Sequence, residues 1–168
     1  MSYQEIKNLV SILAGFIILA AYILYLNSQY SSGAASTDDL LFAAQTMLRF
    51  IAIGVGVAIL LQILFHILYS VGFAAKEYIQ AEAKDTKVDD KAFDRKISGE
   101  MKEDERDRLV GLRASSVSYV LVGVGFLAGL LVIVMDYSVV VMLNIFFLSF
   151  LIASIVEGFV QIYLYRRN

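Results

Sequence analysis

The sequence contains no cysteine and no proline. Without cysteine, the chain has no disulfide bond, no thiolate metal site and no cysteine nucleophile. Without proline, the most frequent cause of a sharp helix kink is missing, so helices in this chain are predicted to be long and fairly straight.

Histidine and charge are also scarce. The single histidine, His66, cannot form an all-histidine metal site, and catalytic zinc usually takes three protein ligands. Charged residues make up 18% of the 168 residues and the net charge is -2, which provides no basic surface for nucleic acid. No Walker loop, HExxH motif or Ser/His/Asp set occurs. We therefore expect no enzyme, no cofactor, no metal site and no direct contact with nucleic acid.

Apolar residues dominate what is present. They make up 59% of the chain, against about 45–50% in a typical soluble domain. They form four long stretches at about 9–26, 40–73, 117–135 and 139–164. Each stretch is near or above the roughly 20 residues that a helix needs to cross a bilayer. The sequence therefore predicts four transmembrane helices, with the lipid bilayer as their solvent.

Most of the charge lies between the second and third stretches, in the segment 76–113. Residues 90–97 have the pattern of a short amphipathic helix, which Ser98-Gly99 would end. Gly99 is the last strong helix breaker, so a helix is predicted from about Met101 directly into the third span. At the start of the second span, Ser36 and Asp39 have the spacing of a capping box.

Lysine and arginine are distributed unequally between the two sides of the predicted membrane. The connections 27–39 and 136–138 have neither residue, whereas the segment 76–113 and the C-terminal Arg166-Arg167 are basic. Cytoplasmic segments carry the excess of these residues. Both termini and the segment 76–113 are therefore predicted to be cytoplasmic.

The two apolar halves resemble each other. Aligning the second span with the fourth pairs Gly54 with Ser149, Ala58 with Ala153, Gln62 with Glu157, and His66 with Gln161. Chance matching of apolar helices is one explanation. The coincidence of scarce polar residues favours the other, two similar hairpins in tandem related by an axis along the membrane normal.

The paired residues recur every fourth position, so each set follows one face of its helix. Small residues let helix backbones approach closely, and polar residues can hydrogen-bond across the contact. We expect the second and fourth helices to pack side by side through Gly54, Ala58, Ser149 and Ala153. Gln62, His66, Glu157 and Gln161 would then form an intramembrane polar cluster. Gly125-x-x-x-Gly129 in the third span is a further close-approach motif.

Glu157 is the only acidic residue inside a predicted span. An ionisable residue there usually faces protein or a watery cavity. Two interpretations stay open. Glu157 is a proton or cation site, or it fastens helices through a hydrogen bond to Gln62, His66 or Gln161.

The start of the third helix carries a recognisable segment. Residues 104–114 read DERDRLVGLRA, followed at the membrane by Ser118-Tyr119. This segment resembles the DERD/E-x-L-I-x-L-K/R-A segment before the third span of uncharacterised small bacterial four-helix integral membrane proteins, and the opening residues 1–7 are also similar. Some of those proteins have a basic residue where Ser116 stands. The resemblance implies a multi-pass protein of the plasma (inner) membrane, in some cases beside a small helix-turn-helix regulator, and supplies no activity.

The predicted fold is an all-α polytopic membrane protein with four transmembrane helices as two tandem similar hairpins. It divides into a first hairpin (1–75), a charged cytoplasmic helical connector (76–113) and a second hairpin (114–168). The connector is either a solvated linker or a docking surface, and the residues expected to interact are Asp104, Glu105, Arg106, Asp107, Arg108 and Arg113.

Two functions follow from these features. The first is a non-enzymatic membrane protein, a sensor or regulator, that presents the connector to a cytoplasmic protein partner. The alternative is a small proton- or cation-linked transporter that uses Glu157. Four helices alone barely enclose a path, so the transporter would be a homo-oligomer.

Overall fold

The computed structural model describes residues 3–33, 36, 38–83, 99, 102 and 104–167. Four helices contain nearly all of them: α1 (Tyr3–Ser31), α2 (Leu40–Ala83), α4 (Glu105–Val134) and α5 (Val139–Arg167). No strand occurs within these described ranges. The predicted all-α class is confirmed, and all four helices are long and apolar enough to cross a membrane. The amphipathic helix predicted at 90–97 lies outside the described residues.

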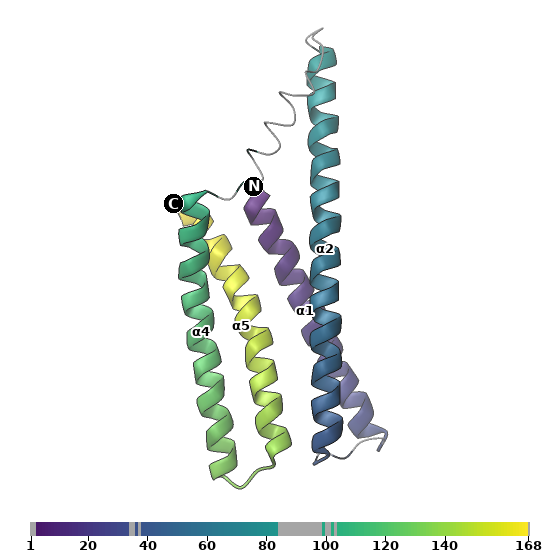
Figure 1. Ribbon diagram of the computed structural model, residues 1–168, viewed down its shortest axis with the longest axis vertical. Helices are drawn as coiled ribbons and strands as arrows, with labels where there is room; N and C mark the ends of the chain where they lie inside the picture. The colour runs from purple at the N-terminus through teal and green to yellow at the C-terminus, as the bar shows by residue number, and fades with distance from the viewer. Residues whose placement is uncertain are drawn as a thin grey trace.

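Consecutive helices run in opposite directions, and the two chain ends lie at the same end of the bundle (Figure 1). We call this the terminal end. The opposite end, which holds the connections after α1 and after α4, is called the turn end. α2 extends beyond the other helices at the terminal end (Figure 1).

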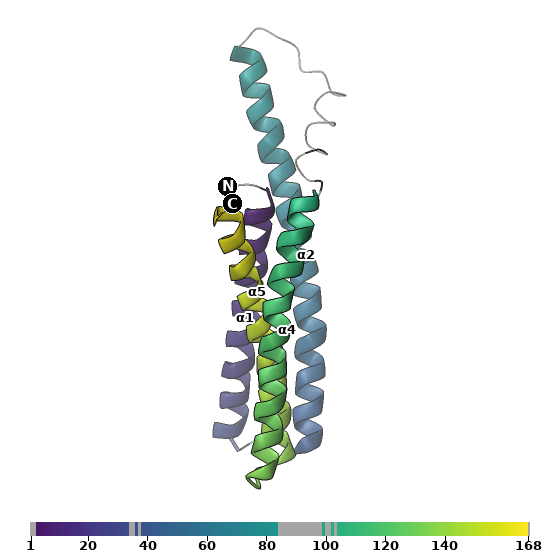
Figure 2. The same cartoon turned by 90° about the vertical axis from the view of Figure 1, so that its left-hand side faces the viewer.

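The helices form an open row rather than a closed bundle. α5 packs most extensively on α4 and next on α1, whereas α2 packs mainly on α1 and only slightly on α5. In Figure 1, α5 lies between α4 and α2, and α1 passes behind α2 toward the turn end. In Figure 2, α1 and α2 lie on the two sides of the view. α2 therefore stands partly away from the rest of the structure.

Side-chain caps fix where two of the helices begin. The Asp39 carboxylate accepts a hydrogen bond from the Phe42 amide at 2.9 Å, so Asp39 caps α2 where the sequence suggested a box that begins at Ser36. Asp104 and Asp107 form a full capping box, and α4 begins at Glu105 rather than at about Met101. α4 then continues without a break to Val134.

Glycines allow α5 to approach both of its main neighbours closely. A Cβ added at Gly125 of α4 would collide with Ser149, and one added at Gly129 would collide with the Phe146 ring. On the α1 side, a Cβ at Gly158 would lie 2.5 Å from Ile12 Cγ1. These contacts hold α4, α5 and α1 together along their length.

Candidate functional site

A polar pocket of about 340 Å³ lies between α1, α4 and α5 at the terminal end. Each of the three helices contributes polar side chains to its wall. The lining residues are Gln4, Lys7, Asn8 and Ser11 from α1, Asp107 and Gly111 from α4, and Ser154, Glu157, Gly158, Gln161 and Tyr165 from α5. The pocket therefore gathers ionisable groups, amides and hydroxyls from segments that are far apart in the sequence.

Glu157 is held in this wall by a hydrogen bond from α4. The Ser115 hydroxyl donates to Glu157 Oε1 at 2.6 Å, and both side chains are partly buried. The bond gives an acceptor oxygen that is partly removed from water a hydrogen-bond partner. Ser115 did not stand out in the sequence, although it follows Gly111 by four residues and so shares its helix face.

Polar contacts at the end of α5 tie the three helices together beside the pocket. Arg106 donates from Nη2 to the Tyr165 carbonyl oxygen at 3.3 Å, which joins the start of α4 to the end of α5. Arg166 lies 3.8 Å from Glu5, which joins α5 to α1. The Arg166 side chain is 65% exposed, so this ion pair contributes little to stability.

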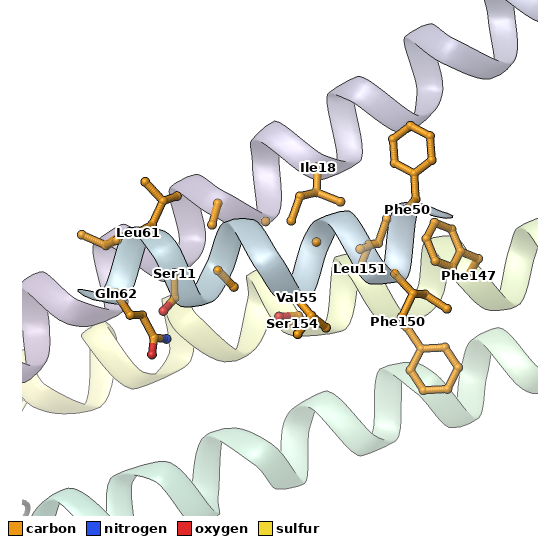
Figure 3. Close-up of a pocket in the computed structure, with 16 residues that line it drawn as sticks. Ser11, Ile18, Phe50, Val55, Leu61, Gln62, Phe147, Phe150, Leu151 and Ser154 are labelled. Carbon is orange, nitrogen blue, oxygen red and sulfur yellow. The ribbon is translucent and has the colours of Figure 1, made fainter. Parts of the chain in front are cut away.

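An apolar cavity of about 580 Å³ lies between α1, α2 and α5, where α2 stands away from α5. Figure 3 shows Gln62 and Ser11 at one end of the cavity and Phe50 and Phe147 at the other. Ser11 and Ser154 line both this cavity and the polar pocket. The two spaces therefore adjoin at these serines.

A cluster around Tyr22 lies beyond the cavity on its turn-end side. The Tyr22 ring packs against Phe147 at 4.6 Å and Phe50 at 5.1 Å between ring centroids. Its hydroxyl donates to Asn144 Oδ1 at 2.7 Å, and the residue is only 1% exposed. Neither Tyr22 nor Asn144 could be singled out from the sequence, because one tyrosine among ten and one asparagine in an apolar span carry no distinctive spacing.

The predicted polar cluster is divided in the structure. Glu157 and Gln161 lie in the wall of the polar pocket, and Gln62 is an exposed residue at the edge of the apolar cavity. His66 is exposed, and its Nδ1 is hydrogen-bonded to the Tyr3 hydroxyl at 3.1 Å. The expected hydrogen bond to Glu157 from Gln62 or His66 is thus replaced by the bond from Ser115.

The small residues of the stripe also have other neighbours than expected. Gly54 faces Ile18 of α1, since a Cβ added to it would lie 3.3 Å from Ile18 Cδ1, and Ser149 faces Gly125 of α4. Ala153 is buried, and Ala58 lines the apolar cavity. The expected packing of α2 on α5 through these four residues is therefore wrong. The two helices share a buried cluster at Ala43, Met47, Val140 and Phe147, and Ala58 lines the cavity.

Among the described residues of the connector, 76–83 form the end of α2 and 104–113 form the start of α4 with its cap. Asp104 is the cap, and Asp107 is half-buried at the pocket wall. Glu105, Arg106, Arg108 and Arg113 are exposed, and Arg106 also donates to the Tyr165 carbonyl oxygen. The same helical turns therefore present one carboxyl group to the pocket, and one acidic and three basic side chains to the outside.

In the described part of the chain, no three His, Asp or Glu side chains gather closely enough to hold a metal ion. The chain matches no protein-family model, no curated protein and no solved structure.

Proposed function

We propose that this chain is a non-enzymatic multi-pass membrane protein, a sensor or regulator, that presents its charged connector to a cytoplasmic protein partner. One observation carries the proposal. Asp107 and Gly111 line the polar pocket together with Glu157, while Glu105 and Arg108 on the same turns of α4 are exposed. Because α4 is one continuous helix, a change in the pocket would move the exposed charges with it.

Insertion in a membrane is supported by the outward faces of the helices. Large apolar side chains are exposed along all four, for example Leu24 at 68%, Leu60 at 67% and Val134 at 82%. Soluble monomers rarely expose contiguous apolar surface on this scale, whereas hydrocarbon is a compatible surrounding for it.

A cytoplasmic terminal end is supported by the basic residues. Of the basic residues in the four described helices, all but Arg49 of α2 lie toward that end: Lys7, Lys76, Arg106, Arg108, Arg113, Arg166 and Arg167. This is the asymmetry that orients multi-pass proteins. Two tandem similar hairpins are supported by Gly54 and Ser149, which each lie against the preceding helix of their own pair.

The test reverses exposed connector charges in the full chain. The variant Glu105→Arg/Arg108→Glu is expected to reach the membrane in normal amount but to recover at least threefold less of a cross-linked partner from native membranes. Arg167→Glu, an exposed charge at the same end outside the connector, serves as the matched control. Equal partner recovery by the double variant and the control would contradict the proposal.

The transporter is the second candidate, because Glu157 lines a pocket at the end where the charged connector begins. Against it, the adjoining cavity is mainly apolar and ends at the Phe50 and Phe147 rings, which have no oxygen or nitrogen atom to coordinate a cation. Proton flux into liposomes that contain the full chain tests it. Flux that is abolished in Glu157→Gln would favour transport, and no flux above that of empty liposomes would exclude it.

A further inference from the structure

The apolar cavity and the polar pocket form one amphiphilic groove. They meet at Ser11 of α1 and Ser154 of α5, which line both. From this junction the apolar part extends toward the turn end, to Phe50 and Phe147 (Figure 3). The polar part extends toward the terminal end, to Gln4 and Tyr165. A ligand that fills both parts must have an apolar body and a polar end.

The apolar part has the depth of one bilayer leaflet. On α2 its wall runs from Phe50 to Gln62, which at a rise of about 1.5 Å per residue is about 18 Å. A leaflet contributes half of a hydrocarbon core that is about 30 Å thick. The volume of about 580 Å³ also lies within the roughly 300–1,000 Å³ of small-molecule sites. The cavity therefore fits a chain that runs parallel to the helices from the headgroup level to the middle of the bilayer.

The groove opens sideways, where α2 and α5 barely touch. Ile51 and Val55 of α2 and Phe150 of α5 line the cavity and are also exposed. An acyl chain could therefore enter from the surrounding bilayer without passing through water. Passage through water would cost about 0.8 kcal/mol for each exposed CH₂ group.

The polar part carries both signs of charge. Lys7 supplies an ammonium donor, while Asp107 and Glu157 supply carboxyl groups. A phosphate would pair with Lys7, and a primary ammonium would pair with Asp107 in a charge-assisted hydrogen bond. Amide groups of Asn8 and Gln161 complete a surface for a headgroup that carries both charges.

We infer that this groove binds one phospholipid with a zwitterionic, primary-ammonium headgroup. One hydrocarbon chain lies in the apolar cavity, and the headgroup lies in the polar pocket. The inference rests on the proposed function to the extent that this lipid is the ligand to which the connector responds. Lipid binding itself needs no protein partner, so the two fail separately.

The test is native mass spectrometry of the full chain in detergent, with phosphatidylethanolamine or phosphatidylglycerol of identical acyl chains. The chain is expected to retain one phosphatidylethanolamine per copy, at least threefold more than phosphatidylglycerol. Ala58→Leu, which fills the cavity, should lower the retention of both lipids at least threefold. Ala52→Leu is the matched control, because Ala52 is exposed on the same helix and lies outside the cavity. Lys7→Gln should also lower both, and Lys76→Gln should change neither.

Equal retention by Ala58→Leu and Ala52→Leu would overturn the inference, as would equal retention of the two lipids by the unsubstituted chain. A lipid-free dimer that Ala58→Leu dissociates would also overturn it, because a second copy would then fill the groove. If Ala58→Leu does not fold, a photoactivatable acyl chain on phosphatidylethanolamine gives the answer in the unsubstituted chain. Cross-links in 50–62 and 147–154 support the site, and cross-links spread over the exposed face of α4 overturn it.

The partner experiment separates the two claims. Lost lipid retention in Ala58→Leu without any change in partner recovery would leave the connector proposal without this ligand. If lipid is retained but Glu105→Arg/Arg108→Glu recovers as much partner as the Arg167→Glu control, the connector proposal is wrong and the lipid site remains.

Discussion

Ser115 of α4 donates a hydrogen bond to Glu157 of α5 over 2.6 Å, at the wall of the polar pocket. The bond joins α4, which carries the exposed connector charges, to α5, which carries one of the two acidic groups of the pocket. Closer to the turn end, the same two helices meet through Gly125 and Ser149 and through Gly129 and Phe146. Ser115 and Glu157 therefore form a polar link between the pocket and the connector.

Substitutions of Glu157 test this link. Glu157→Gln keeps an oxygen that can accept from Ser115, so the free energy of unfolding should change little. Glu157→Leu removes the acceptor and should lower the free energy of unfolding by about 1–2 kcal/mol, the value found for interhelical hydrogen bonds in model membrane peptides. Reversible unfolding in mixed micelles measures both.

The same variants separate the two interpretations of Glu157. If Glu157→Gln keeps both stability and partner recovery, the residue fastens helices. If it keeps stability but abolishes partner recovery or proton flux, the fastener interpretation is wrong and the carboxyl group has a protonation role. Ser115→Ala should be as destabilising as Glu157→Leu, and adding it to Glu157→Leu should cost little more, because the bond is already lost.

Glycines 123 and 125 of α4 provide a matched pair for the α4–α5 contact. A Cβ at Gly125 would collide with Ser149, whereas a Cβ at Gly123 meets no atom within 4 Å. Gly125→Ala should therefore destabilise the protein by about 1–3 kcal/mol, as overpacking does. Gly123→Ala should be neutral or stabilise by up to about 1 kcal/mol through helix propensity. Thermal unfolding in detergent compares them, and equal melting temperatures would contradict the packing.

The start of α4 depends on its capping box. The Asp104 carboxylate accepts from the Asp107 amide at 2.7 Å, and the Asp107 carboxylate accepts from the Asp104 amide at 3.2 Å. Asp104→Ala should cost about 1 kcal/mol and let the first turn fray. Amide exchange of residues 105–108 should become faster, whereas Glu105→Ala, outside the box, should leave it unchanged. Unchanged exchange in Asp104→Ala would mean that the cap does not hold this end.

Topology can be tested with single cysteines, because the chain has none of its own. Arg108→Cys and Tyr137→Cys lie near opposite ends of α4, and both native side chains are exposed. A membrane-impermeant maleimide added to intact cells should label Tyr137→Cys only, and both sites should react after lysis. Labelling of both sites in intact cells, or of Arg108→Cys alone, would reverse or abolish the proposed orientation.

The fold class could be predicted from the sequence because four long apolar stretches leave few other choices. The neighbours of each polar residue could not, because that requires the rotation of each helix about its axis. Apolar side chains surround most of the circumference of α5, so no hydrophobic face distinguishes the side toward α4 from the side toward α2. The repeat therefore predicted a contact between Glu157 and Gln62. In the structure, the close approach at Gly125 and Gly129 places α4 and its Ser115 on the side of α5 that carries Glu157.

Two further features depended on long-range packing. The alignment of α2 with α5 suggested that these two helices contact each other. In the structure α1 packs on α5 instead, with Ile12 of α1 against Gly158 and Ile155 of α5 against Gly15. α2 packs mainly on α1. The groove between α2 and α5 results from that arrangement. No local pattern in the sequence predicts this groove, because its wall combines residues from three helices.

Amide exchange of residues 105–113 in lipid nanodiscs tests most directly whether the pocket and the connector are linked. Two variants of α5 each remove the acceptor of an interhelical hydrogen bond. Glu157→Leu removes the acceptor of the bond from Ser115, and Asn144→Leu removes the acceptor of the bond from Tyr22 near the turn end. The variants are compared at matched residual stability. We predict at least threefold faster exchange of residues 105–113 in Glu157→Leu and no change in Asn144→Leu. Equal exchange of this segment in the two variants would contradict the link between the pocket and the connector.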